Sequence, residues 1–221
     1  NVAVRERDDM LLITAVNQIN HGGPQAVIDS EQGVAVASLN LDAGKKAMKM
    51  SDFFSAHSFF DHGISYLRKG HWEEQYDLSL ELFNLAAKCA LMNAEHAHLE
   101  ILIQQILRFA RCFEDKCQAI SISITLLFLS GKIVKGVKAS LSTLASLGEE
   151  LNQSPRWVPQ LVIDYITPSL VHKTLSATEA KLAELSDDTL LSYHAMADPS
   201  KLMAMELLAN LYELLAFGGD Y

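Results

Sequence analysis

A run of helical patterns separated by very short breaks is the feature of this sequence that most constrains its fold. Apolar residues recur at helical spacing in six successive segments, at 30–50, 53–69, 76–91, 95–109, 114–130 and 133–147. Short connections place successive helices side by side and antiparallel, so residues 30–150 are expected to form three helical hairpins. Residues 120–129 alternate like a strand, but their place between helices at hairpin spacing favours a helix. The fold class is therefore predicted to be all-α.

Two further helical patterns flank the hairpins. Residues 7–20 are amphipathic, and the glycines and proline at 22–24 end this helix. Near the C-terminus, Asp198 is suited to cap a helix whose first position is Pro199, and apolar residues continue from there to Phe217. A second cap is expected at Ser30, at the start of the first hairpin.

The predicted organisation has three parts. Residues 1–29 form an N-terminal helix that ends a preceding domain, residues 30–150 form the hairpins, and residues 151–221 form a C-terminal helical extension. The chain begins at Asn1 without a methionine, so we expect it to belong to a longer polypeptide.

Small residues recur at fixed places in the hairpins, in the order typical of tetratricopeptide (TPR) repeats. Small residues let two helices approach closely, and large apolar residues fill the groove beside them. Ala56, Leu99 and Gly136 are expected to be equivalent, at spacings of 43 and 37 residues, longer than the usual repeat of about 34. The expected repeat positions are Gly44, Ala56, Phe60 and Gly63, then Ala87, Ala94, Leu99, Ile103 and Ile106, then Gly131, Gly136 and Ser140. They predict degenerate TPR-like hairpins stacked into a right-handed superhelix, an α-solenoid. An irregular helical bundle is the alternative.

Composition restricts the partners of this chain. The formal net charge is −9, which argues against nucleic acid or an anionic membrane as a partner, because both require a surface rich in Lys and Arg. The uncharged apolar run at residues 117–131 is too short and too rich in Ser and Thr to span a bilayer. Three cysteines lie inside apolar helical patterns and are expected to be reduced. We therefore expect a cytoplasmic protein.

Four ordered segments of the chain resemble one region of very large multidomain signalling kinases. These segments are VNQINHGG (16–23), LNLDAGKKAMKMSDFFSAHSFFDHGISYL (39–67), YDLSLELFNLAAKCALM (76–92) and MADPSKLMAMELL (196–208). In that family, a protein-kinase-like domain and a predicted ATPase of the STAND type precede a TPR-like helical region, and a GAF domain and often a histidine kinase follow it. The resemblance implies that this chain is the helical region between the ATPase and the output domains.

No catalytic motif of that family occurs in this chain. It lacks a Walker phosphate-binding loop, a His-Arg-Asp loop and a phosphoacceptor His box. We therefore expect a non-catalytic helical-repeat scaffold that couples domains of a signalling kinase, without a cofactor. Its partners would be neighbouring domains or another protein chain. Two alternatives remain open, namely a stand-alone TPR adaptor that binds a peptide in its groove and an all-helical metal-dependent enzyme.

The metal-dependent alternative rests on the sequence HSFFDH. His57 and Asp61 lie one helical turn apart and could share a metal ion, whereas His62 points elsewhere. A metal site normally needs three or four ligands, so two ligands on one face favour a solvated surface and no metal. His96 is expected to fill the aromatic position that packs between TPR hairpins.

A peptide-binding TPR groove would need cationic and amide side chains on its concave face. Lys45, Asn84 and Lys88 are the candidates, although a salt-bridged surface is the favoured interpretation of these residues.

The C-terminal helix is apolar around more than half of its circumference. We expect one stripe, containing Leu202 and Leu208, to pack on residues 176–185 and the last hairpin. The other stripe consists of Met203, Leu207, Leu214 and Phe217. It is predicted to meet a second copy of the chain or the following domain, because monomers rarely expose large apolar patches. Burial of this stripe by residues 154–176 is the alternative.

Overall fold

The computed structural model describes residues 2–147 and 198–217. Within these ranges the chain is helical and contains no strand, which confirms the predicted all-α class. The segment 120–129 belongs to a helix, as predicted. None of the helices in the described ranges combines the length and the apolar character that a membrane span requires.

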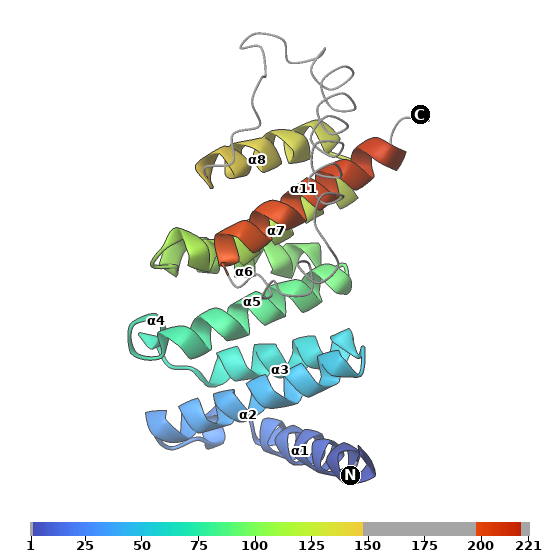
Figure 1. The fold of residues 1–221 in the computed structure, drawn as a ribbon. Helices are drawn as coiled ribbons and strands as arrows, with labels where there is room; N and C mark the ends of the chain where they lie inside the picture. Colours follow the sequence, from blue (N-terminus) through green and yellow to red (C-terminus); the bar gives the residue numbers. More distant parts are fainter. Residues whose placement is uncertain (1, 148–197, 218–221) are drawn as a thin grey trace, which may run out of the picture. The chain divides into compact units, whose positions relative to one another are not determined.

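The helices occur where the sequence patterns predict them, with one addition. The α-helices are α1 (Val2–Gly22), α2 (Ser30–Lys49), α3 (Phe53–Tyr66), α4 (His71–Glu74), α5 (Tyr76–Met92), α6 (His96–Phe109), α7 (Phe113–Leu129), α8 (Ile133–Ser146) and α11 (Pro199–Phe217), shown in Figure 1. A 3₁₀ turn covers Pro24–Ala26. The short helix α4 was not predicted, because four residues are too few for a periodic pattern.

The chain forms two compact units, residues 1–122 (unit 1) and 123–221 (unit 2). The division falls inside α7. It differs from the predicted boundaries after residues 29 and 150, which stay predictions.

In unit 1, helices that follow one another in the chain pack against one another. The main contacts join α2 to α3, α3 to α5, and α5 to α6, and Figure 1 shows these helices side by side in chain order. Gly44 on α2 lies directly against the Phe60 ring on α3. Ala37 and Ala43 of α2 and Ala56 of α3 are fully buried as well. The small side chains allow the two helices to approach closely.

Three hairpin turns, between α2 and α3, α5 and α6, and α7 and α8, have the same backbone conformation. In each turn one residue is left-handed: Ser51 (φ 61°), Ala94 (φ 59°) and Gly131 (φ 69°). The next residue donates its backbone N–H to a carbonyl five residues earlier, as in Asp52 to Ala47 (3.0 Å), Glu95 to Ala90 (2.9 Å) and Lys132 to Leu127 (2.9 Å). This is the Schellman motif, which satisfies the last carbonyls of a helix.

The helices that follow these turns also correspond in length. Helices α3, α6 and α8 have 14 residues each. Helices α5 and α7 have 17 residues each. The left-handed residues are 43 and 37 residues apart. Because the helices correspond in length, the whole difference between these two spacings lies in the connectors between hairpins, 67–75 and 110–112. Ala56, Leu99 and Gly136 each lie five residues after a left-handed residue, and all three are buried.

Side-chain caps begin three of the helices. Asp52 accepts a hydrogen bond from the Ser55 N–H at 3.0 Å, and Asp198 accepts one from the Ser200 N–H at 2.9 Å. The predicted cap at Ser30 is wrong. Asp29 caps α2 instead by accepting from the Gln32 N–H at 2.8 Å, since its extended backbone turns the carboxylate toward the free donors.

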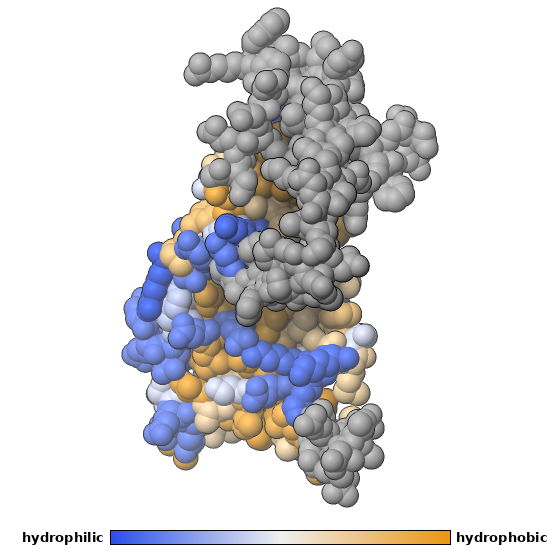
Figure 2. Space-filling view, in the orientation of Figure 1, coloured by the Kyte–Doolittle hydropathy of each residue, from blue (hydrophilic) through white to orange (hydrophobic). Residues whose placement is uncertain are grey.

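Apolar side chains also reach the surface of unit 1. Figure 2 shows hydrophobic surface between hydrophilic bands in this view, over the helices at the N-terminal end of the chain. Exposed apolar residues of α1, the end of α2 and the start of α3 include Met10, Met50 and Phe54.

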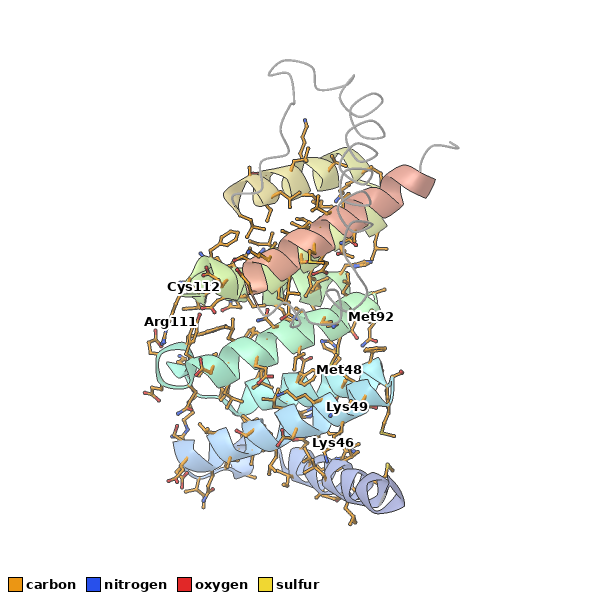
Figure 3. The ribbon with its side chains drawn as sticks, in the orientation of Figure 1. Lys46, Met48, Lys49, Met92, Arg111 and Cys112 are labelled. Atoms are coloured by element: carbon orange, nitrogen blue, oxygen red, sulfur yellow. The ribbon has the colours of Figure 1, made fainter. Side chains whose placement is uncertain are left out.

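The long connector 67–75 is anchored by an aromatic cluster. Trp72 of α4 is buried and stacks on Phe109, with ring centroids 5.3 Å apart. It also contacts Phe83 at 5.0 Å. Arg111, labelled in Figure 3, lies over the Tyr76 ring with its guanidinium carbon 3.9 Å from the ring centroid. These contacts hold both connectors against α5.

Candidate functional site

Three potential metal ligands meet between α3 and α6. His57 and Asp61 lie one turn apart on α3, and His98 reaches them from α6. His57 Nε2 is 3.6 Å from Asp61 Oδ2, and His98 Nδ1 is 3.6 Å from the same oxygen. One donor atom from each of the three residues lies within 4.8 Å of the other two. This is the one such group of three in the described ranges.

His57 lies at the buried side of this cluster. His57 is 4% exposed, and the centroids of the His57 and His98 rings are 5.1 Å apart. Nδ1 is 3.3 Å from Glu95 Oε2 at the start of α6. Nε2 is buried and has no hydrogen-bond partner among the described residues. Asp61 Oδ2 at 3.6 Å is too distant for a hydrogen bond, so this nitrogen is left without one although a carboxylate lies nearby.

Burial raises the pKa values of two acidic groups at or near the cluster, Asp61 and Cys89. It raises the pKa of Asp61 above its usual value, while the nearby imidazoles of His57 and His98 act in the opposite direction. Burial also raises the pKa of the Cys89 thiol to about 11, although the positive charge of Lys88 acts to lower it. Cys89 is therefore a neutral thiol at physiological pH and a poor ligand, because metals bind the thiolate.

The sequence interpretation of His57 as part of a solvated face is wrong. Glu95, at the start of α6, and His98 of α6 lie against His57, which is buried. Helix α6 thereby also supplies the third donor, His98. His96, which was predicted to be the packing aromatic, is exposed, and His98 contacts His57 instead. His62 lies outside the cluster, as predicted, with Nδ1 2.7 Å from the Ser58 carbonyl oxygen. The i, i+4 spacing of His57 and Asp61 was a usable signal, but no local pattern connects them to His98.

The predicted groove residues do not share one exposed surface. Lys45 on α2 forms an ion pair with Glu81 on α5 at 2.6 Å, the salt-bridged role that the sequence left open. Asn84 is buried, and its Oδ1 has no hydrogen-bond partner in the described part of the chain. Lys88 is exposed.

In the first turns of α11, the stripe that was predicted to pack inside the chain is exposed, and the other stripe is buried. Leu207 is fully buried and Met203 is nearly so, whereas Leu202 is 46% exposed and Leu208 is exposed as well. Helix α11 packs on α8 within unit 2. The sequence alone did not identify which face of α11 is buried. The side chains of Leu214 and Phe217, and the proposed contacts with 154–176 and 176–185, lie outside the described residues.

An apolar hollow of about 250 Å³ opens at the N-terminal end of unit 1. Residues of α1, the end of α2 and the start of α3 form it, including Met10, Ile13, Met50, Phe54 and Phe59. Phe54 is 74% exposed at its rim.

Comparison with protein-family models, with curated proteins and with solved structures gives no match.

Proposed function

We propose that this chain is a non-catalytic helical-repeat scaffold that couples domains of a multidomain signalling kinase. In this proposal the hairpins are degenerate TPR-like repeats that stack into a right-handed α-solenoid. The observation that carries it is the repetition of one turn conformation at Ser51, Ala94 and Gly131, each followed by a helix of 14 residues. Repeated hairpins with matching lengths are the units from which solenoids are built, and such arrays bind other proteins through extended surfaces.

The apolar hollow at α1 is the contact surface that we assign to the coupling. Met10, Met50 and Phe54 expose apolar area in one place, and such patches on proteins mark sites of association. In the order implied by the resemblance, the ATPase precedes this chain, so the proposed occupant of the hollow is the ATPase domain.

The test measures binding of the ATPase domain to this chain by calorimetry. Phe54→Glu is expected to weaken binding at least tenfold, since it places a charge at the rim of an apolar contact (on the order of 1.4 kcal/mol for tenfold). Ile101→Glu is the matched control, because Ile101 is an exposed apolar residue of α6 outside the hollow. Equal effects of both changes, or a full-length protein without an ATPase domain, would contradict the proposal.

A further inference from the structure

We propose that His57, Asp61 and His98 form a zinc site that joins α3 to α6. The ligand atoms are His57 Nε2, Asp61 Oδ2 and His98 Nδ1. This inference is independent of the proposed coupling function, because it rests on other residues of unit 1 than those that line the hollow.

The distances between the donor atoms suit one small cation. In a tetrahedral zinc site with bonds of about 2.0–2.1 Å, ligand atoms lie about 3.3 Å apart. Two of the three pairs here are 3.6 Å apart, which a small side-chain adjustment brings to that value. The same distances are too long for hydrogen bonds and lie within ion-pair range of the Asp61 carboxylate and the two histidines.

The unpartnered nitrogen of His57 is the second observation. A buried polar atom normally has a partner, and His57 Nε2 has none in the described ranges although Asp61 and His98 surround the space in front of it. Glu95 lies 3.3 Å from the other ring nitrogen. A carboxylate in this position keeps the proton on Nδ1 and leaves the Nε2 lone pair free for a metal, as in many histidine-ligated sites.

The donor set selects the metal. Two imidazoles and one carboxylate suit Zn²⁺, whereas Mg²⁺ and Ca²⁺ prefer oxygen ligands throughout. Three protein ligands leave a fourth position for water. Asp61 and His98 are each about one third exposed, so this position faces solvent. Because α3 and α6 are the second helices of two consecutive hairpins, the bound ion fixes one hairpin against the next.

The experiment uses the full 221-residue chain, stripped with a chelator and titrated with Zn²⁺ alone. We expect one Zn²⁺ per chain by calorimetry and elemental analysis, and a zinc-dependent rise in Tm, because an ion that binds only the folded state stabilises it. Mg²⁺ at the same concentration should give neither effect. Co²⁺ in place of zinc should show the ligand-field absorption of a tetrahedral site.

Variants separate this site from adventitious binding by surface histidines. His98→Ala and Asp61→Asn should each abolish stoichiometric binding and the Tm shift while the circular dichroism spectrum stays helical. Glu95→Ala should weaken binding by roughly 10- to 100-fold, as loss of an outer-shell partner does. His96→Ala, which changes an exposed histidine two residues from His98, is the control and should bind as the wild type does. The proposal is overturned if the wild type binds no zinc, or if His98→Ala and Asp61→Asn both retain it.

Discussion

Ala94 has a left-handed backbone that an alanine adopts only at a cost. Its φ is 59°, close to the φ of 69° at Gly131 in the corresponding turn of the third hairpin. A left-handed conformation is unfavourable for L-residues by roughly 1–2 kcal/mol, because Cβ crowds the following carbonyl oxygen. The turn between α5 and α6 keeps this conformation because the Schellman hydrogen bonds around it satisfy the end of α5.

The change Ala94→Gly should therefore stabilise unit 1. We expect the free energy of unfolding to rise by about 0.5–1 kcal/mol, since the relief of strain exceeds the added entropy of a glycine in the unfolded chain. Denaturation by urea, followed by circular dichroism, measures the change. Ala35→Gly, at an exposed position inside α2, is the control and should destabilise by roughly the same amount. A destabilising effect of Ala94→Gly would contradict this account of the turn.

Single residues were predictable from the sequence where their roles depend on near neighbours. The cap at Asp198 is local, since its acceptor meets a donor two residues away, and the sequence predicted it correctly. The burial of His57 depends on α6, and its partners Glu95 and His98 follow it by about forty positions. No pattern around residue 57 contains that information, so the third donor of the candidate zinc site was missed.

At the scale of elements, contacts between glycine and phenylalanine set how closely paired helices approach. A Cβ atom on Gly44 would lie 2.3 Å from Phe60 Cε1, and one on Gly136 would lie 2.2 Å from Phe128 Cε1. Phe60 is fully buried, so its ring has no free space into which to move. The glycine thus determines the distance between α2 and α3.

Replacement of Gly44 by alanine should separate α2 from α3. We expect a loss of roughly 1–2 kcal/mol in the free energy of unfolding, because overpacking outweighs the better helix propensity of alanine. The measurement is again chemical denaturation. A second change, Phe60→Leu, should restore part of the loss in the double variant by removing the obstructing ring.

Gly22→Ala serves as the matched control for this prediction. Its added Cβ would meet only Ala26 Cβ, at an ordinary contact distance of 3.5 Å, so no destabilisation is expected. If Gly44→Ala is as well tolerated as Gly22→Ala, the close approach of α2 and α3 is not a constraint on this fold.

The existence of the elements could be predicted, but not always the face that each one buries. Periodicity located α2, α3, α5 and α6 to within a few residues. For α11 it showed two apolar stripes, and the structure buries Leu207 while exposing Leu202, the reverse of the prediction. A stripe on an isolated helix does not specify its partner, since both stripes offer similar hydrophobic area.

At the scale of the whole molecule, the described contacts mostly join elements that are neighbours in the chain. In unit 1 they run from α1 to α2, α3, α5 and α6 in order. Repeat proteins with such contacts are stabilised by nearest-neighbour interfaces, and we expect the stability of unit 1 to be distributed along the chain in the same way. Perturbations are then expected to remain local.

Hydrogen exchange can test this expectation with two glycine variants. Gly136→Ala in unit 2 should accelerate exchange in α8 and leave α3 and α5 protected. Gly63→Ala in unit 1, whose Cβ would lie 2.8 Å from Leu82 Cδ2, should accelerate exchange in α3 and α5 and leave α8 unchanged. Acceleration in all helices by either variant would show that the chain unfolds as one cooperative body.

The connectors between hairpins account for the whole difference between the two spacings of 43 and 37 residues, while the three turns and the helices after them keep one size. For protein engineering, this difference separates the turns, which fix the geometry of the hairpins, from the connectors, which are expected to tolerate inserted sequence. A sensing loop or reporter peptide inserted between α6 and α7 would lengthen the connector 110–112, which is shorter than the connector 67–75 between α3 and α5. The same insertion at a hairpin turn would break the hydrogen bonds that end a helix.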